Sequence, residues 1–274
     1  MTDEHILHDL QREIAGFAAA RIDAPVRVQR PKIARILLAR DGSDQDATAT
    51  AVSAAVTANT GAPVIELSPA PDQAADALLA EARADDLLVL PCPFGADYAA
   101  VGSVSLAPTL DVLLARSPCA MLLVRGPIEN PARVLGRPLV ILQLDRHRKV
   151  NATCWAIGVA GHGGDITLLS VVDPQHRVER AELLGRYLPV GDLAPEILLS
   201  LAGARAAALV AALQRGSREL HIEAHLKVRV GALPTVALEA GARHGGILVG
   251  GLDRQAPGEA RALVLGSKLP LLLV

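Results

Sequence analysis

The sequence repeats one pattern of elements in its middle and again at its end. Residues 86–125 predict an apolar strand at 87–90, a loop with glycines, a helix and a second apolar strand at 121–124. Residues 244–274 give the same order and close on the apolar run 271–274. Wholly apolar strands that alternate with helices are typical of parallel sheets covered on both faces. A repeat of this length predicts two copies of one α/β domain.

The two copies meet in a segment rich in proline and glycine, residues 126–138. We place the domain boundary inside it and predict domains at 1–134 and 135–274. Each copy ends in an apolar strand, and an exposed apolar edge strand promotes aggregation unless something covers it. We therefore expect the strands at 121–124 and 271–274 to lie at the contact between the copies, as an internal pseudo-dimer.

The stretch between the first strand and the strand before the glycine loop is shorter in the first copy than in the second. The stretch from Asp41 to Asp86 is far shorter than the matching stretch from Asp145 to Gly246, so the first copy lacks about one helix-plus-strand unit. The chain begins with an amphipathic helix at 4–21, followed by a short alternating run at 26–28. We predict that residues 4–30 supply the missing unit from the other end of the domain.

Composition narrows the classes of function. The chain has 274 residues, of which 51% are hydrophobic and 20% charged, a globular mixture. With 2% aromatic residues and a net charge of −2, it has neither the stacking platforms nor the basic footprint that nucleic-acid binding needs. Cys92, Cys119 and Cys154 are too far apart for a zinc or redox motif. No secretory signal or membrane span is recognisable, and we expect a cytoplasmic protein.

A carboxylate follows the first strand of each copy. Asp41-Gly42-Ser43 comes directly after the strand at 36–39, and Asp145 follows the strand at 139–144. In open α/β sheets, ligands bind at the carboxyl ends of the strands, so both aspartates are candidate binding residues. The alternative for Asp41 or Ser43 is that it caps the helix that follows.

The first copy resembles a known family in three places. The stretch ILLARDGS at 36–43, the pair Gly102-Ser103 before an apolar helix and the stretch SPCAMLLV at 117–124 are similar to the universal stress proteins, and the two copies resemble the tandem members of that family. The resemblance implies an open parallel sheet in each copy, the adenine nucleotide alpha hydrolase-like fold. In nucleotide-binding members, ATP is held by the aspartate after the first strand, here Asp41, and by a loop of the form G-x2-G-x9-G-[ST] after the fourth.

The glycine loop departs from the family pattern. Glycines let backbone N–H groups approach phosphates, and the following helix N-terminus adds partial positive charge. Gly102 and Ser103 would meet the phosphates in this way. Pro91, which has no N–H, stands where the first glycine belongs, the loop is shorter by two residues, Gly95 is the glycine left inside it, and Asp97 would repel phosphate. The resemblance implies ATP or another adenine nucleotide as ligand, and these changes predict weak or lost binding.

The second copy departs from the pattern differently. Gly250-Gly251 follows its fourth strand, but no Gly-Ser pair precedes the helix near Glu259. A basic run instead follows Asp145 directly: Arg146, His147, Arg148 and Lys149. Such a run is either a solvated face or an anion site, and if the protein binds an anion we expect it beside Arg146, Arg148 and Lys149.

Catalysis has little support in the sequence. His162 lies in Gly-His-Gly-Gly, but no serine or cysteine stands in a nucleophile elbow. His221 and His225 are four residues apart without a third ligand nearby in the sequence, so we predict no metal site.

We therefore expect a non-enzymatic, stress-related regulatory protein that acts through an unidentified protein partner, as an intramolecular pseudo-dimer or a higher homo-oligomer. The alternative is a soluble regulatory domain of a membrane transporter, similar to the cytosolic domains of cation-chloride cotransporters, which binds no nucleotide. It would reach the membrane through its transporter partner.

Overall fold

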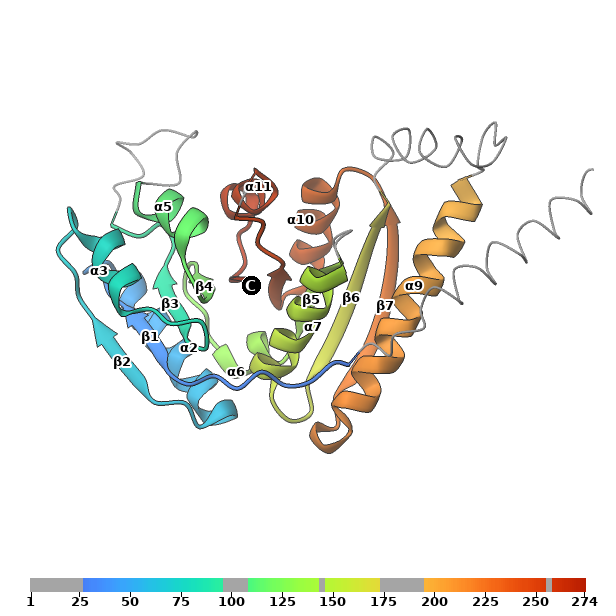
Figure 1. Cartoon of the computed structure of the whole chain (residues 1–274), viewed down its shortest axis with the longest axis horizontal. Coiled ribbons are helices and arrows are strands. Elements are labelled where there is room, and N and C mark those ends of the chain that lie inside the picture. Colours follow the sequence, from blue (N-terminus) through green and yellow to red (C-terminus); the bar gives the residue numbers. More distant parts are fainter. Residues whose placement is uncertain (1–26, 96–107, 143–145, 173–194, 255–257) are drawn as a thin grey trace, which may run out of the picture.

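The computed structural model describes residues 27–95, 108–142, 146–172, 195–254 and 258–274 (Figure 1). In the first half, strands and helices alternate along the chain: β1 (Ile36–Ala39), α2 (Gln45–Thr60), β2 (Val64–Leu67), α3 (Ala74–Glu81), β3 (Leu87–Pro91), α5 (Pro108–Arg116), β4 (Ala120–Val124) and α6 (Pro131–Leu135).

The second half continues the alternation of strands and helices. In chain order they are β5 (Pro138–Leu142), α7 (Arg146–Ala160), β6 (Asp165–Val172), α9 (Pro195–Gly216), a 3-10 turn η1 (Arg218–Leu220), β7 (Glu223–Val230), α10 (Leu233–His244), β8 (Ile247–Gly250), α11 (Gly258–Gly266) and β9 (Leu271–Leu273). The predicted α/β fold class is confirmed.

All these strands form one sheet, in the order β2-β1-β3-β4-β9-β8-β5-β6-β7. Pairing is parallel within each half and antiparallel where the halves meet, with Met121 opposite Leu273 and Leu123 opposite Leu271. The predicted contact between the two terminal strands is therefore confirmed, and the halves form a pseudo-dimer joined through β4 and β9. Because each terminal strand covers the other, neither is left as an exposed apolar edge.

The two halves share one strand order, apart from one missing strand. In the second half, β6 and β7 lie on one side of β5, and β8 and β9 on the other. In the first half, β1 has β2 on one side and β3 and β4 on the other, and the described residues hold no partner for the outer edge of β2. The described residues of the first half thus hold no counterpart of α9 and β7, as the spacing between Asp41 and Asp86 predicts.

The segment that leads into β1 crosses to the second half (Figure 1). Residues 27 and 28 form no strand, so the strand predicted at 26–28 is wrong in its described part. The Gln29 amide donates to Cys154 Sγ of α7 at 3.4 Å, and Val28 is buried. Residues 27–30 therefore lie against the second half instead of extending the first-half sheet at β2, because apolar burial against α7 and α9 holds them there. Residues 4–26 lie outside the described part, so their predicted role stays a prediction.

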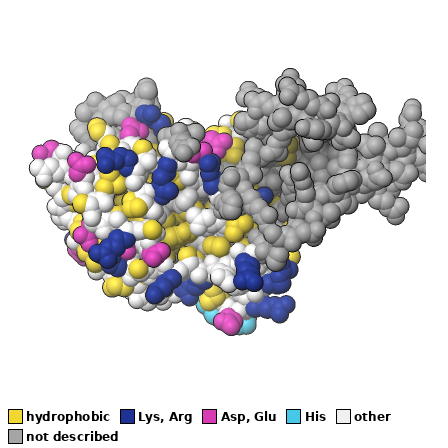
Figure 2. All heavy atoms as spheres, in the orientation of Figure 1, with side chains coloured by type: hydrophobic (Ala, Val, Ile, Leu, Met, Phe, Trp, Pro, Cys, Tyr) yellow, Lys and Arg dark blue, Asp and Glu magenta, His cyan; other side chains and the backbone are white. Residues whose placement is uncertain are grey.

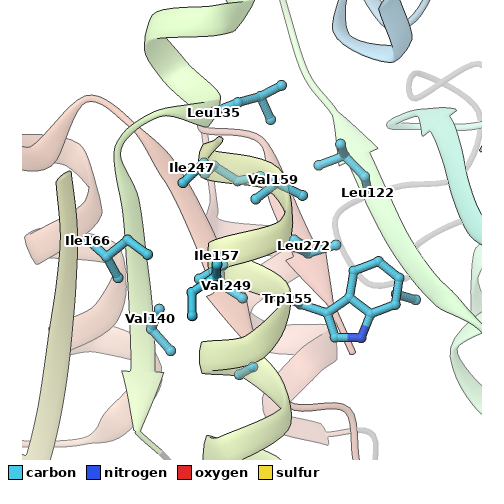
Figure 3. Packing of buried hydrophobic residues seen from close by; sticks show 14 of the residues in the cluster. Leu122, Leu135, Val140, Trp155, Ile157, Val159, Ile166, Ile247, Val249 and Leu272 are labelled. Carbon is cyan, nitrogen blue, oxygen red and sulfur yellow. The ribbon is translucent and has the colours of Figure 1, made fainter. Parts of the chain in front are cut away.

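Two apolar clusters cover the two faces of the sheet. One joins α2, α7 and α9 to one face and spans both halves; Figure 3 shows Leu122 of β4, Leu272 of β9 and Trp155 of α7 within it. The other joins α3, α5, α10 and α11 to the opposite face. Both faces of the inner strands are buried, which is why sequences such as those of β1, β3, β4 and β5 are continuously apolar, whereas the edge strands β2 and β7 are partly exposed.

Two helices lie in segments that the sequence analysis singled out for other reasons, the linker and the basic run. Helix α6 lies inside the predicted linker, where Pro131 opens it and the Asn130 side chain accepts a hydrogen bond from the Arg133 amide at 3.0 Å. Helix α7 begins at Arg146, so the basic run is part of its first turns. Among the helices described, none is long and apolar enough to cross a membrane.

Candidate functional site

Asp41 stands at the carboxyl end of β1, as predicted, but its side chain is occupied by the protein itself. Its Oδ2 accepts a hydrogen bond from the Gly95 amide at 2.8 Å, and its Oδ1 accepts from the Ser43 amide at 3.0 Å. Gly95 belongs to the loop after β3, so Asp41 ties the two loops of the first-half site together. Both carboxylate oxygens that a nucleoside would need are bonded within the chain.

A second carboxylate holds the same turn in place. Asp46, in the first turn of α2, accepts hydrogen bonds from the amides of Asp41 at 3.2 Å and Gly42 at 3.0 Å. Gly42 and Gly95 have φ values of +81° and +63°, which favour glycine. The N-cap residue of α2 is Asp44, whose side chain makes no cap, so the predicted alternative of a helix cap by Asp41 or Ser43 is wrong.

The environment of Asp41 favours its ionised form. Partial burial raises the pKa of this carboxyl, but the hydrogen bonds from Gly95 and Ser43 outweigh that effect and hold the pKa below its ordinary value. Asp41 is therefore ionised at neutral pH, and its carboxylate holds the Gly95 and Ser43 amides in place.

A cation that contacts the residue after β3 is used in the junction between the halves. Arg125, which follows β4, donates to Cys92 Sγ at 3.1 Å and to the carbonyl of Val264 in α11. The sequence analysis did not identify Arg125, although its position directly after an apolar strand could have marked it. Gly102 and Ser103 lie outside the described residues, so their predicted phosphate contacts are untested.

In the second half, the basic run lies at the start of α7. Arg148 Nη2 forms an ion pair with Asp253 Oδ2 at 2.7 Å, which ties the first turns of α7 to the loop after β8. The Lys149 carbonyl accepts a bond from Thr153 Oγ1 at 2.7 Å. Asp253 was missed in the sequence because it stands far from the basic run. Asp145 lies outside the described residues, and so does the side chain of Arg146.

Gly250 and Gly251 lie at the carboxyl end of β8, next to β5 and β9. A Cβ at Gly250 would meet its nearest heavy atom, of Leu263, at 3.8 Å, which is ordinary contact. Packing therefore does not require glycine there.

A groove of about 1110 Å³ opens beside this edge, between the two halves. Its lining comes from the segment before β1, the starts of β3 and β4, the first turns of α7, the loop after β8 and the end of β9. Its cationic side chains are Arg27, Lys32, Arg148 and Arg254, and its carboxylate is Asp85. The space-filling view shows charged side chains of both signs spread over the described face, without one continuous basic surface (Figure 2).

The histidines do not form a metal centre among the residues described. His225 Nε2 lies 3.2 Å from Asp165 Oδ1, and the rings of His162 and His221 are 5.0 Å apart between centroids. No group of three or more metal-ligating side chains is found in the described ranges.

The fold is that of an open α/β sheet with a switch point between β5 and β8, beside the groove. The sequence matches no protein-family model and no curated protein. Among solved structures, it is similar to a universal stress protein from Archaeoglobus fulgidus at 13% identity, with a TM-score of 0.53, covering 90% of this chain and 97% of that one. A Pseudomonas aeruginosa protein assigned to the universal stress proteins matches at 13% identity with a TM-score of 0.45, over 87% and 81% of the two chains. The similarity to the Archaeoglobus fulgidus structure confirms the predicted universal-stress-protein-like fold.

Proposed function

We propose that this chain is a non-enzymatic, cytoplasmic regulatory protein of the universal-stress type in which nucleotide binding has weakened. The first-half site is closed by its own loop, and any nucleotide or other anion binds at the second half. The observation that carries this proposal is the Asp41 carboxylate, which is hydrogen-bonded to Gly95 and Ser43.

The hydrogen bonds that Asp41 accepts from Gly95 and Ser43 lower the affinity for a nucleotide that the first half can reach. A nucleoside hydroxyl that takes the place of the Gly95 amide at Asp41 Oδ2 breaks a hydrogen bond of 2.8 Å to a charged acceptor. Hydrogen bonds to charged groups contribute about 1.5 to 3 kcal/mol, so the displacement costs roughly tenfold to a hundredfold in affinity. Pro91, which lies in β3, also removes one amide that could face a phosphate.

The second half keeps its cations at the corresponding edge. Arg148 lies in the first turns of α7, where the helix dipole adds partial positive charge. Its partner Asp253 is on the loop after β8, so the pair orients the guanidinium toward the groove that Arg148 lines. A partly exposed arginine held in this way can exchange its carboxylate partner for a phosphate.

Calorimetric titration with ATP tests the proposal on the full chain, with the variants Asp41→Ala and Arg148→Ala. We expect weak or undetectable binding to the parent, unchanged by Asp41→Ala and reduced by Arg148→Ala. The exposed Arg116→Ala, at the end of α5, is the matched control for loss of a positive charge. Submicromolar affinity that disappears with Asp41→Ala alone would refute the proposal.

The closed first-half site also fits the alternative function, a regulatory domain of a membrane transporter that binds no nucleotide. The location of the protein in the cell distinguishes the two proposals. Fractionation of cells that express the full chain should leave it in the soluble fraction under our first proposal. If the chain is instead recovered with the membranes, and deletion of a transporter gene next to its own gene returns it to the soluble fraction, the alternative is favoured.

A further inference from the structure

We propose that the groove between the halves is a composite site for a ligand that carries several phosphate groups, held jointly by the N-terminal segment and the second half. This deepens the proposed function and rests on it for Arg148, but it adds Arg27 and Lys32, which belong to neither nucleotide motif of the two copies. At about 1110 Å³, the groove is slightly larger than the usual range for small-molecule sites, roughly 300 to 1,000 Å³.

Charge defines the chemistry of the ligand. The cationic side chains of the lining come from three segments that are far apart in the sequence: Arg27 and Lys32 before β1, Arg148 in α7 and Arg254 after β8. Within the described residues, Arg27, Lys32 and Arg254 make no side-chain ion pair, and Asp85 is the one carboxylate side chain of the lining. Like charges gathered around one groove repel, and a polyanion between them relieves that repulsion.

The mixture of side chains fits phosphate. Guanidinium groups form bidentate hydrogen bonds to phosphate oxygens, and the lysine ammonium adds a compact charge with three donors. Because the cations come from both the N-terminal segment and the second half, a single anion cannot satisfy all of them as well as a chain of phosphates can. The site therefore favours a polyphosphate group over free inorganic phosphate.

The segment that carries Arg27 and Lys32 is already fixed in place. Val28 is 3% exposed. Its carbonyl oxygen lies so close to Gly216 of α9 that a Cβ at that glycine would stand only 2.0 Å from it. Arg30 donates to the Asn59 carbonyl at the end of α2, and Pro31 packs against Gly158 of α7. The backbone that carries the two cations is thus docked beside the groove before a ligand arrives, so binding needs to order their exposed side chains and not the segment itself.

A ligand bound in the groove would connect the N-terminal segment with the second half. A bound polyphosphate would bridge the segment before β1 and the loop after β8, across the starts of β3 and β4. The ligand would thereby stabilise the docking of residues 27–32 on the second half. A regulatory protein could report the ligand through the N-terminal part of the chain.

Trp155 supplies a direct reporter, because it lines the groove and is the single tryptophan of the chain. Tripolyphosphate should change its fluorescence in a saturable way on the full chain. We expect Lys32→Gln and Arg254→Gln each to weaken the apparent affinity about tenfold or more, since each removes one charge-assisted contact. Arg116→Gln, with its exposed position on α5, should leave the affinity unchanged.

Further arms of the titration separate this site from the nucleotide positions. Inorganic phosphate should bind at least tenfold more weakly than tripolyphosphate, because it cannot reach cations on separate segments at once. Alkylation of the half-buried Cys154, which also lines the groove, should slow when tripolyphosphate is present.

The outcomes that would overturn the inference are equally specific. They are the absence of any fluorescence change or heat at millimolar tripolyphosphate, equal losses for Lys32→Gln and Arg116→Gln, or equal affinities for phosphate and tripolyphosphate. Tight ATP binding that depends on Asp41 would refute the proposed function alone, because it leaves Lys32 and Arg254 untouched.

Discussion

Asp86 holds three elements of the first half together, and its removal should be the most damaging polar substitution there. It lies directly before β3 and is 1% exposed. Its Oδ1 accepts from Arg35 Nε at 3.0 Å, and its Oδ2 accepts from Arg35 Nη2 at 2.6 Å and from the Arg83 amide at 2.9 Å. Arg35 precedes β1 and also donates to the Glu81 carboxylate of α3 at 2.9 Å.

The geometry sets the size of the effect. Loss of one partner of a buried ion pair costs about 3 to 5 kcal/mol, because the other charge is left uncompensated. Arg35 is 18% exposed and keeps Glu81, so we expect Asp86→Ala to lower the free energy of unfolding by about 3 kcal/mol, the low end of that range. The pair of Arg40 and Glu66 is more open, with side chains 35% and 53% exposed, so the control Glu66→Ala should cost at most about 1 kcal/mol.

Urea denaturation followed by circular dichroism measures both variants at pH 7. A loss for Asp86→Ala no larger than that for Glu66→Ala would refute this account of the Arg35 pair. A double-mutant cycle with Arg35→Met should give a coupling energy above 1 kcal/mol, since the two side chains share two hydrogen bonds.

The same carboxyl predicts a pH dependence. Burial raises the pKa of Asp86, but the hydrogen bonds from Arg35 and the Arg83 amide outweigh it and hold the pKa below its ordinary value. A lowered pKa in the folded state means that the stabilisation is complete above about pH 4 and is lost as the pH falls through the folded value. The difference between the parent and Asp86→Asn should therefore shrink on acidification below about pH 4, and a difference that grows there would contradict the assignment.

Two further substitutions test the packing that joins the halves. Leu272→Ala, at a fully buried position of β9, should lower the free energy of unfolding by about 2 to 5 kcal/mol in calorimetry, whereas Leu265→Ala, 38% exposed, should cost far less. Gly216→Ala would place a Cβ 2.0 Å from the Val28 carbonyl oxygen, so residues 27–32 should become more sensitive to limited proteolysis. The control Gly203→Ala lies in the same helix with nothing within 4 Å of its Cβ, and equal proteolysis of the two variants would contradict the docking of Val28.

The sequence alone determined the alternation of elements and the meeting of the terminal strands. Strand β1 occupies the predicted residues, and β3 and β4 extend the predicted runs by one residue each, because strands buried on both faces are continuously apolar. Helix α6 escaped prediction because its five residues carry no apolar period, and a local cap at Asn130 forms it.

The sequence predicted where the Asp41 site lies, but not whether the carboxylate oxygens are free to bind a ligand. Asp41 follows a strand, which places it at the carboxyl edge of the sheet in any fold of this class. Whether its oxygens face a ligand or an amide depends on the path of the loop at Gly95, 54 residues further along the chain. No local pattern encodes that contact.

The groove was decided by tertiary structure alone. The sequence singles out Arg148 as part of a basic run but gives no reason to join it with Arg27, Lys32 and Arg254, which gather around it because β4 and β9 pair antiparallel. That pairing sets the starting edge of the first half's strands beside the carboxyl edge of the second, while the burial of Val28 brings the N-terminal segment across the junction. Periodicity records which face of an element is buried, whereas the approach of distant segments depends on how those buried faces fit together.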